Sequence, residues 1–238
     1  QGPIVTLKTA KEGDFDKYYP TSVMETAYDI LPFWVMRMLM LGIEMTGTVP
    51  FKTVYLHGLV RDEKGQKMSK SKGNVINPLE LSDKYGTDAL RMALVMSTTA
   101  GVDSATGENK VRGMRNFANK IWNAARFALD IRSSIVDRRE KDEDFEKKMR
   151  EVLRDMTRLL NENRVGLAAE TIYNEFWHWF CDEQIEASKK DEVSETVLLT
   201  GLKTFLILLH PFVPFVTEAV WSEVFPDDGL LITQEWPK

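Results

Sequence analysis

Four lysines and no acidic residue fill the nine positions from Lys64 to Lys72, KGQKMSKSK. A loop that concentrates ammonium groups in this way is suited to binding an anion, because each lysine acts as a positive point charge on a flexible stem. The alternative is a solvated basic loop, since most exposed lysines contribute little beyond solubility. From the residue types alone, both interpretations stay open.

The elements around this loop predict a parallel α/β unit. An apolar run that has Pro32 at a first helical position and ends at Gly47 predicts a helix, and Thr53–Val60 (TVYLHGLV) predicts a buried strand. Ligands of open α/β sheets bind beyond the carboxyl ends of the strands, where this strand delivers the lysines. After the loop, Asn77-Pro78 starts a helix that Gly86 ends, and Thr87 caps a second helix from Asp88 to about Ser97.

The remaining sequence is helical. Residues 1 to about 20 read as an edge strand or loop, and residues 22–29 as a short turn or strand end. Helical periods cover about 108–136, 143–164, 167–188, 194–210 and 215–225, and the single later strand expected is Leu231–Thr233. The Thr-, Gly- and Ser-rich break at 98–107 predicts a boundary between domains 1–106 and 107–238.

Composition excludes several classes of protein. With 238 residues, 43% hydrophobic and 28% charged, the chain is neither disordered nor collagen-like. A single cysteine, Cys181, excludes a disulfide framework and a cysteine-based zinc site within one chain. The apolar stretch Ile30–Met45 contains Arg37 and Glu44 and is shorter than the ~20 residues that span a bilayer, so it predicts a buried helix. Without a visible secretion signal, we expect a cytoplasmic protein.

A local basic segment makes nucleic acid a candidate partner. The formal net charge is −5, yet residues 109–132 carry six basic residues against Asp130 alone. At helical spacing, the side chains expected to face the core are Phe117, Ile121, Ala124, Ala125 and Ala128. The more exposed ones are then Arg115, Asn119, Lys120, Asn123 and Arg126. An ordinary amphipathic surface helix would show the same pattern.

The string Lys67-Met68-Ser69-Lys70-Ser71 resembles the signature loop of the class I aminoacyl-tRNA synthetases. Its surroundings resemble the valyl-tRNA synthetases, in FKTVYLHGLVRDEKGQKMSKSKGNVINPLEL, YYPTSVMETAYDILPFWVMRM, RNFANKIWNAARF and LLHPFVPFVTEAVW. The similarity extends from about Phe15 to the end. It implies an α/β fold, a partial Rossmann-type nucleotide-binding half with the lysine loop, followed by an all-α helical-bundle anticodon-binding domain.

The resemblance also implies roles for individual residues. Lys67 and Lys70 would stabilise the β- and γ-phosphates of ATP, with Met68, Ser69, Ser71 and Gly73 completing a loop that closes. His57 and Gly58 would lie beside adenine and ribose, although a lone histidine there is as often structural. Asp29 would lie near the ribose and Ile30 against the valine side chain. The family usually has glycine at Ala27 and phenylalanine at Pro32, which weakens the expected close approach at Ala27.

Substrates and partners follow from the same resemblance. They are ATP with Mg²⁺, valine and tRNA(Val), with no tightly bound cofactor, no protein-bound metal and no membrane, in a monomer. The anticodon candidates are Arg115, Asn119, Asn123, Arg126 and Phe127, because unstacked bases are read on their edges and stacked on aromatics. Rejecting threonine requires a second, hydrolytic site, which nothing in these residues supplies.

Two rival hypotheses for the function stay open. An isoleucyl- or leucyl-tRNA synthetase is the nearest enzymatic rival, and a freestanding tRNA-binding protein is the other. Only about 60 residues precede the lysine loop, without a His-Ile-Gly-His-type signature, so we expect a fragment that does not activate valine by itself.

Two aromatic segments are expected to have structural roles. Packing between helices is the role expected of the cluster Trp177, His178, Trp179 and Cys181. Core packing and the start of a helix are expected of the segment 210–215 (HPFVPF).

Overall fold

A computed structural model describes residues 13–62, 64–96, 98, 100–105, 107–131 and 139–237. The side chains of Lys70 and Ile131 lie outside this description. The chain divides into two compact units, one comprising residues 1–60 with 99–104 and the other residues 61–98 with 105–238. Each unit is described by itself.

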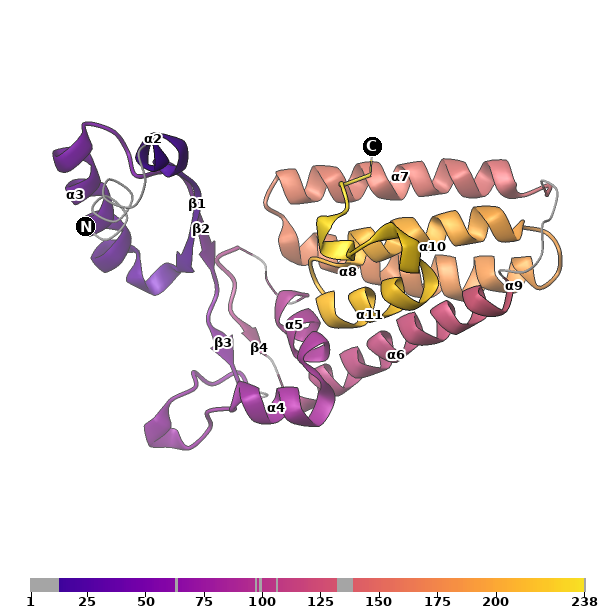
Figure 1. The fold of residues 1–238 in the computed structure, drawn as a ribbon. Coiled ribbons are helices and arrows are strands. Elements are labelled where there is room, and N and C mark those ends of the chain that lie inside the picture. Colours follow the sequence, from indigo (N-terminus) through magenta and orange to yellow (C-terminus); the bar gives the residue numbers. More distant parts are fainter. Residues whose placement is uncertain are drawn as a thin grey trace. The chain divides into compact units, whose positions relative to one another are not determined.

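The first unit is built on two parallel strands joined through a helix (Figure 1). After α2 (Asp14–Tyr18), β1 (Thr21–Ala27) leads through η1 (Tyr28–Ile30) and η2 (Leu31–Val35) into α3 (Met36–Thr46) and β2 (Phe51–His57). The strands pair in parallel from Thr21↔Phe51 to Ala27↔His57. The predicted α/β unit is confirmed, and Gly47 ends α3 in the left-handed conformation that glycine tolerates, with φ 74°.

Several expectations for this unit are wrong. Residues 14–18 form a helix where an edge strand or loop was expected, whereas residues 1–12 of that expectation lie outside the described residues. Residues 21–27 form the full strand β1 and not a short turn or strand end. The strand expected to be buried as far as Val60 ends at His57, and only Phe51 in it is buried. The apolar stretch is also not buried, since Phe33 is 60% exposed, Trp34 61% and Met40 63%. A two-stranded sheet covers only one side of a helix, so within this stretch only Val35 and Gly42 are buried among the described residues.

The second unit begins with the lysine loop and two short helices, α4 (Pro78–Tyr85) and α5 (Thr87–Val95). β3 (Val60–Arg61) and β4 (Ser104–Ala105) pair as a second two-stranded sheet. The predicted start of α4 is confirmed, because the Asn77 side chain accepts the Leu79 N–H at 3.1 Å. Thr87 does not cap α5. It is the first helical residue, and its hydroxyl lies 2.6 Å from that of Ser82.

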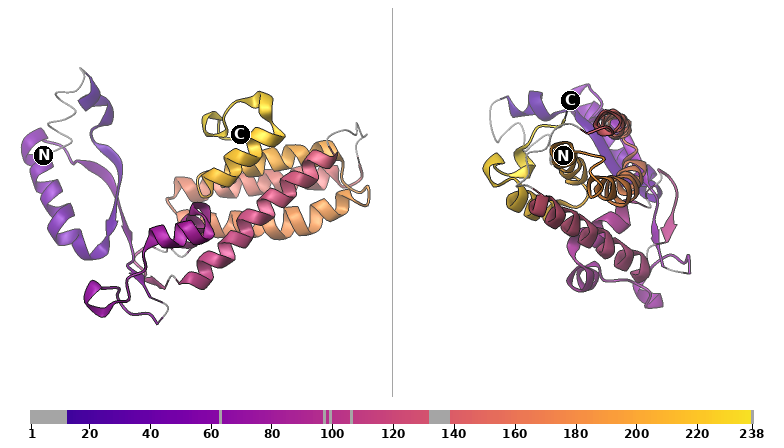
Figure 2. Two further views of the ribbon diagram at one scale, coloured as in Figure 1. Left: turned by 60° about the horizontal axis from the view of Figure 1, so that its bottom comes forward. Right: turned by 90° about the vertical axis from the view of Figure 1, so that its right-hand side faces the viewer.

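Long helices lie alongside one another in the rest of this unit (Figure 2). They are α6 (Glu108–Ile131), α7 (Asp142–Asn161), α8 (Val165–Asn174) continued by η4 (Glu175–Gln184) and α9 (Ile185–Ser188), α10 (Glu195–Leu209) and α11 (Pro214–Val224). All five predicted helices are confirmed, although the expected end of the first, near 136, lies outside the described residues.

The expected strand Leu231–Thr233 is wrong. These residues form the 3-10 turn η6, which follows the short turn η5 (Pro226–Asp228). The carboxylate of Glu218 accepts the N–H of Leu231 at 2.8 Å and that of Ile232 at 3.2 Å. Because Glu218 on α11 accepts both backbone N–H groups, residues 231–233 need no partner strand to satisfy them.

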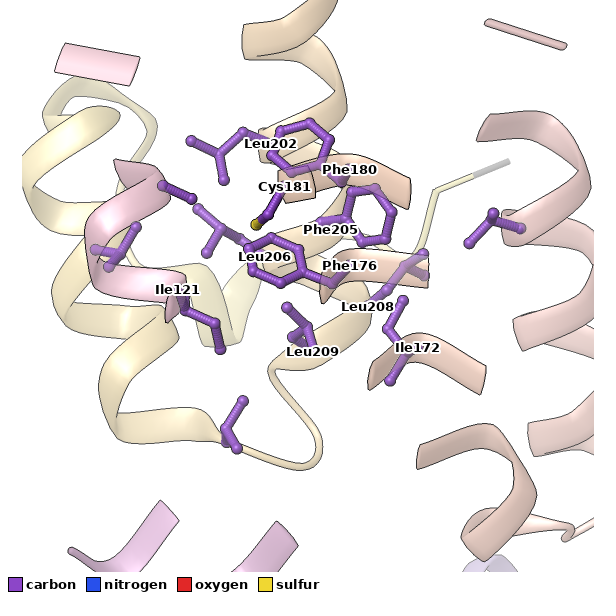
Figure 3. Packing of buried hydrophobic residues seen from close by; sticks show 14 of the residues in the cluster. Ile121, Ile172, Phe176, Phe180, Cys181, Leu202, Phe205, Leu206, Leu208 and Leu209 are labelled. Atoms are coloured by element: carbon purple, nitrogen blue, oxygen red, sulfur yellow. The ribbon is translucent and has the colours of Figure 1, made fainter. Parts of the chain in front are cut away.

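Aromatic side chains from η4 and α10 form the centre of the bundle (Figure 3). The Phe205 ring centroid lies 5.4 Å from that of Phe176 and 5.1 Å from that of Phe180. Cys181 lies in the same layer, and its burial raises the pKa of the thiol to about 12. The packing role predicted for this cluster is confirmed for Cys181, which is inert in these surroundings.

The tryptophans of the cluster also pack, whereas the histidine does not. Trp177 stacks on Phe117 with ring centroids 6.1 Å apart, and Trp179 lies 5.0 Å from Phe145. The His178 side chain is 63% exposed, 3.4 Å from the Asp182 carboxylate, so the packing role expected for it is wrong. Its position on the outer side of η4 turns it towards solvent.

A buried carboxylate joins α5 to the start of α11. Asp88 accepts the backbone N–H groups of Phe215 at 3.2 Å and Val216 at 2.6 Å, although it lies more than 120 residues earlier in the chain. Burial raises the pKa of Asp88, and these hydrogen bonds oppose the increase. Arg91, one helical turn later, donates to the carbonyls of Pro211 and Phe212. As predicted, the HPFVPF segment supplies core residues and the helix start Pro214, but its Phe215 is exposed.

Candidate functional site

The lysine loop consists of two tight turns. In the first, the Asp62 Oδ1 atom accepts the N–H groups of Lys64 at 3.0 Å and Gln66 at 2.7 Å. Gly65 has a φ of 73°, which glycine adopts without strain, and Arg61 then pairs with Lys67 as an antiparallel bridge. This hairpin returns the chain to the end of β3.

The second turn carries the remaining lysines. The Asn74 Oδ1 atom accepts the Ser69 N–H at 2.9 Å, and the Lys72 N–H bonds the Ser69 carbonyl at 3.1 Å. The hydroxyls of Ser69 and Ser71 lie 3.2 Å apart. Gly73 closes the turn with a φ of 66°. The short turn η3 (Lys70–Lys72) thus begins directly after Ser69, whose backbone N–H is bound by the Asn74 side chain.

The predicted loop residues take the following places. Lys67 and Ser71 are exposed, and Met68 and Ser69 are half-buried. Lys70 begins η3 and its side chain lies outside the description. Lys64 and Lys72 are also exposed.

A second group of predicted residues gathers at the carboxyl edge of β1 and β2. Ala27 and His57 are directly paired in the parallel register, and Asp29 and Ile30 follow in η1. Ala27 and Ile30 are half-buried and Asp29 is exposed. This edge belongs to the first unit and the lysine loop to the second.

Both ring nitrogens of His57 have partners. Nε2 lies 3.2 Å from the Glu25 carboxylate, and Nδ1 lies 2.8 Å from the Gly58 carbonyl oxygen. The Glu25 carboxylate is also one cause of a raised pKa of Tyr55, after burial. Sequence reasoning missed Glu25, although its position two residues before Ala27 on the same strand face is a usable signal.

Position 58 must be glycine because the chain's own backbone packs closely against it. A Cβ atom there would lie 1.8 Å from the carbonyl oxygen of Val102. The neighbouring Leu59 N–H bonds the Asp103 carboxylate at 2.7 Å, which holds this segment against the end of β2. On the side where a Cβ atom would point, Gly58 is therefore in close contact with the backbone of Val102, and the nucleotide contact expected there is not needed to explain the glycine.

The exposed face of α6 agrees with the pattern predicted for it. All five apolar side chains expected in the core are buried, namely Phe117, Ile121, Ala124, Ala125 and Ala128. The polar candidates on the opposite arc are exposed, namely Arg115, Asn119, Asn123 and Arg126. Phe127 is half-buried at the edge of this arc, with the Lys189 ammonium group 5.5 Å from its ring.

Two details of α6 differ from expectation. Lys120 turns towards η4, where its ammonium group lies 2.7 Å from the Asp182 carboxylate and 5.5 Å from the Trp177 ring. Trp122, which sequence reasoning did not select, is 43% exposed on the same arc as Arg115 and Arg126. Its spacing of seven and four residues from these arginines was the available signal.

Among the described residues, no group of three or more His, Cys, Asp or Glu side chains could hold a metal ion. In the same part of the chain, the helices are too short or too polar to cross a membrane.

Two family models match parts of the chain. Residues 3–107 match the family described as tRNA synthetases class I (I, L, M and V). Residues 142–238 match the anticodon-binding domain of tRNA ligase.

Individual relatives are similar over nearly the whole chain. The valine–tRNA ligase of Dehalococcoides mccartyi strain CBDB1 is 46% identical over 228 residues, which cover 90% of this chain and 26% of the relative. That of Pelagibacter ubique is 42% identical over 99% of this chain and 29% of its own length. The chain thus spans between a quarter and a third of these relatives.

A solved structure shares the fold. It is the Agrobacterium radiobacter K84 AgnB2 LeuRS in a ternary complex with tRNA and LeuAMS, with a TM-score of 0.80 and 23% sequence identity. The similarity covers 96% of this chain and 30% of that one. At this identity the comparison supports the fold alone.

Proposed function

We propose that this chain is part of a class I tRNA synthetase, namely a valine–tRNA ligase. This enzyme would join the valine carboxylate to the α-phosphate of ATP, releasing pyrophosphate, and then transfer the valyl group from the adenylate to tRNA(Val), releasing AMP. The observation that carries the proposal is the two-turn lysine loop, in a chain 38–46% identical to valine–tRNA ligases. These relatives favour valine over the isoleucyl and leucyl alternatives.

The lysine loop has the chemistry that activation requires. When the valine carboxylate attacks the α-phosphate, negative charge grows on the departing β- and γ-phosphates, which Mg²⁺ accompanies as part of the substrate. Positioned cations stabilise this charge in the transition state. We assign this role to Lys67 and Lys70, with Met68, Ser69 and Ser71 as further ATP contacts.

The edge of β1 and β2 suits the other half of the substrate. Ala27, Asp29 and Ile30 would line the adenylate pocket, with Ile30 against the valine side chain and Asp29 at the ribose. His57 and Gly58 would lie beside the nucleotide. The parallel pairing of Ala27 with His57 supports this assignment, because it puts both at the edge where α/β sheets bind ligands.

The exposed apolar surface of the first unit supports the view that more polypeptide completes this fold. Parallel sheets are normally covered on both faces, and isolated two-stranded sheets are marginally stable. Here Phe33, Trp34 and Met40 remain exposed, and the chain covers only 26% and 29% of the two relatives named above. We infer that the 238 residues alone do not activate valine.

The exposed arc of α6 is our proposed tRNA surface. Arg115, Asn119, Asn123 and Arg126 can hydrogen-bond base edges or phosphates, and Phe127 can contribute stacking. The domain boundary at 106/107, the monomeric state and the cytoplasmic location remain predictions.

Pyrophosphate exchange by the complete ligase tests the activation step. We expect exchange with valine well above that with isoleucine or leucine, and Lys70→Ala should slow it by ~10². Robust exchange by the 238-residue chain alone, or a Lys70→Ala rate within a factor of two of the parent, would contradict the assignment.

Binding of valine tRNA tests the surface on α6. Arg115→Ala and Arg126→Ala should each weaken binding and reduce its dependence on salt, because each removes a cation near phosphate. Arg150→Ala, on the exposed side of α7, is the matched control. Equal affinity of all three variants would place the tRNA elsewhere.

A further inference from the structure

A pair of side chains at the base of the lysine loop connects its two turns. Asp62 and Asn74 lie 12 residues apart, and the Asn74 amide Nδ2 donates to the Asp62 Oδ2 atom at 2.8 Å. Asp62 also accepts two backbone N–H groups of the first turn, and Asn74 accepts one of the second. Two side chains thus determine the backbone path on both sides of Lys67.

The pairing depends on which atoms donate and which accept. An ionised carboxylate only accepts, whereas an amide has one accepting and one donating side. The Ser69 N–H requires the oxygen of Asn74, so the amide nitrogen is turned towards Asp62. The hydrogen bond from Asn74 is the largest cause of a lowered pKa of Asp62, followed by the backbone bond from Gln66. Asp62 is therefore ionised at neutral pH.

We propose that Asp62 and Asn74 are positioning residues that hold the lysine loop in its catalytic conformation. The proposal rests on the function proposed above. Neither residue needs to touch ATP. They act by fixing the backbone from which Lys67 and Lys70 project, and displacements of ~1 Å in such groups can lower rates by up to ~10²-fold.

Exchanging the two residues provides the test. In Asp62→Asn, the one remaining side-chain oxygen is needed by the N–H groups of Lys64 and Gln66, so the new NH2 group faces the NH2 group of Asn74, donor against donor. Asn74→Asp leaves a carboxylate facing a carboxylate. The double variant D62N/N74D restores one donor opposite one acceptor. In the complete ligase, each single variant should lower kcat for valine-dependent pyrophosphate exchange by ~10-fold or more, with KM for valine within about twofold. The double variant should return to within about threefold of the parent.

Asp83→Asn is the matched control, because it removes the same charge from an exposed position on the neighbouring helix α4. It should leave exchange unchanged. Single variants within twofold of the parent, or a double variant no faster than the slower single one, would overturn the positioning role.

Hydrogen exchange of the 238-residue chain separates this proposal from the proposed function. The amides of Gln66 and Ser69 should exchange at least ~10-fold faster in both single variants and recover in the double variant. Unchanged protection refutes the pairing whatever the enzyme does. Protection that changes and recovers as expected, in a ligase that activates another amino acid, supports the pairing and refutes the valine assignment.

Discussion

Replacing Asp88 with alanine should destabilise the second unit, because its carboxylate bridges α5 and α11. Asp88 is 6% exposed and accepts two backbone N–H groups at the start of α11. Hydrogen bonds to charged groups contribute about 1.5–3 kcal/mol each, and loss of a helix cap costs about 1 kcal/mol. Burial disfavours the carboxylate and offsets part of this gain, as its raised pKa indicates. We therefore expect Asp88→Ala to lower the free energy of unfolding by about 2–3 kcal/mol.

Urea and thermal unfolding followed by far-UV circular dichroism measure this effect, because the second unit holds the long helices. The expected decrease in Tm is roughly 5–10 °C for a unit of this size. Asp88→Asn keeps one acceptor and should lose about half as much. Asp83→Ala, exposed on α4, should change stability by less than about 0.5 kcal/mol. If Asp88→Ala is no less stable than Asp83→Ala, the hydrogen bonds from α11 to Asp88 do not stabilise the packing of α5 against α11.

Three further predictions concern the bundle. Burial lowers the pKa of His210 below 6.5, so the folded state binds fewer protons than the unfolded state, and the free energy of unfolding should fall as pH decreases through 6.5. His210→Gln should lose this part of the pH dependence, and a pH profile identical to that of the parent would contradict the prediction. The Cys181 thiol, with a pKa of about 12, should resist a thiol reagent at neutral pH until urea unfolds the chain, so rapid labelling of the native protein would show that it is accessible. Gly201→Ala would place a Cβ atom 2.4 Å from the Phe145 ring, which should cost about 1–3 kcal/mol in urea unfolding, and unchanged stability would mean that the ring has room to move.

Features encoded within one or two helical turns were predictable. The core and exposed arcs of α6 follow from a 3.6-residue period, and the start of α4 follows from Asn77-Pro78, so both needed only neighbouring residues. The concentration of lysines in the loop, on which the proposed anion site depends, is likewise visible in consecutive residues. Its two-turn conformation is not, because the Asp62–Asn74 pair becomes visible only when the chain is folded back on itself.

Burial was the property least accessible from local sequence. The apolar stretch leading into α3 has the composition of a buried helix, yet Trp34 and Met40 are exposed, because burial depends on which elements surround a helix. β1 was missed for a related reason, since a strand is defined by the partner that pairs with it, here β2 some 30 residues later.

The sequence by itself determined the chemistry of this protein, namely a lysine loop, an amphipathic basic helix and the order of the helices, since charge, periodicity and capping are local properties of the chain. Tertiary structure alone decided which of these groups meet. It paired Ala27 with His57 at one sheet edge, closed Gly58 against Val102, and brought Asp88 to the start of α11. These contacts join residues that are distant in sequence, and their free energy arises only when folding removes both partners from water.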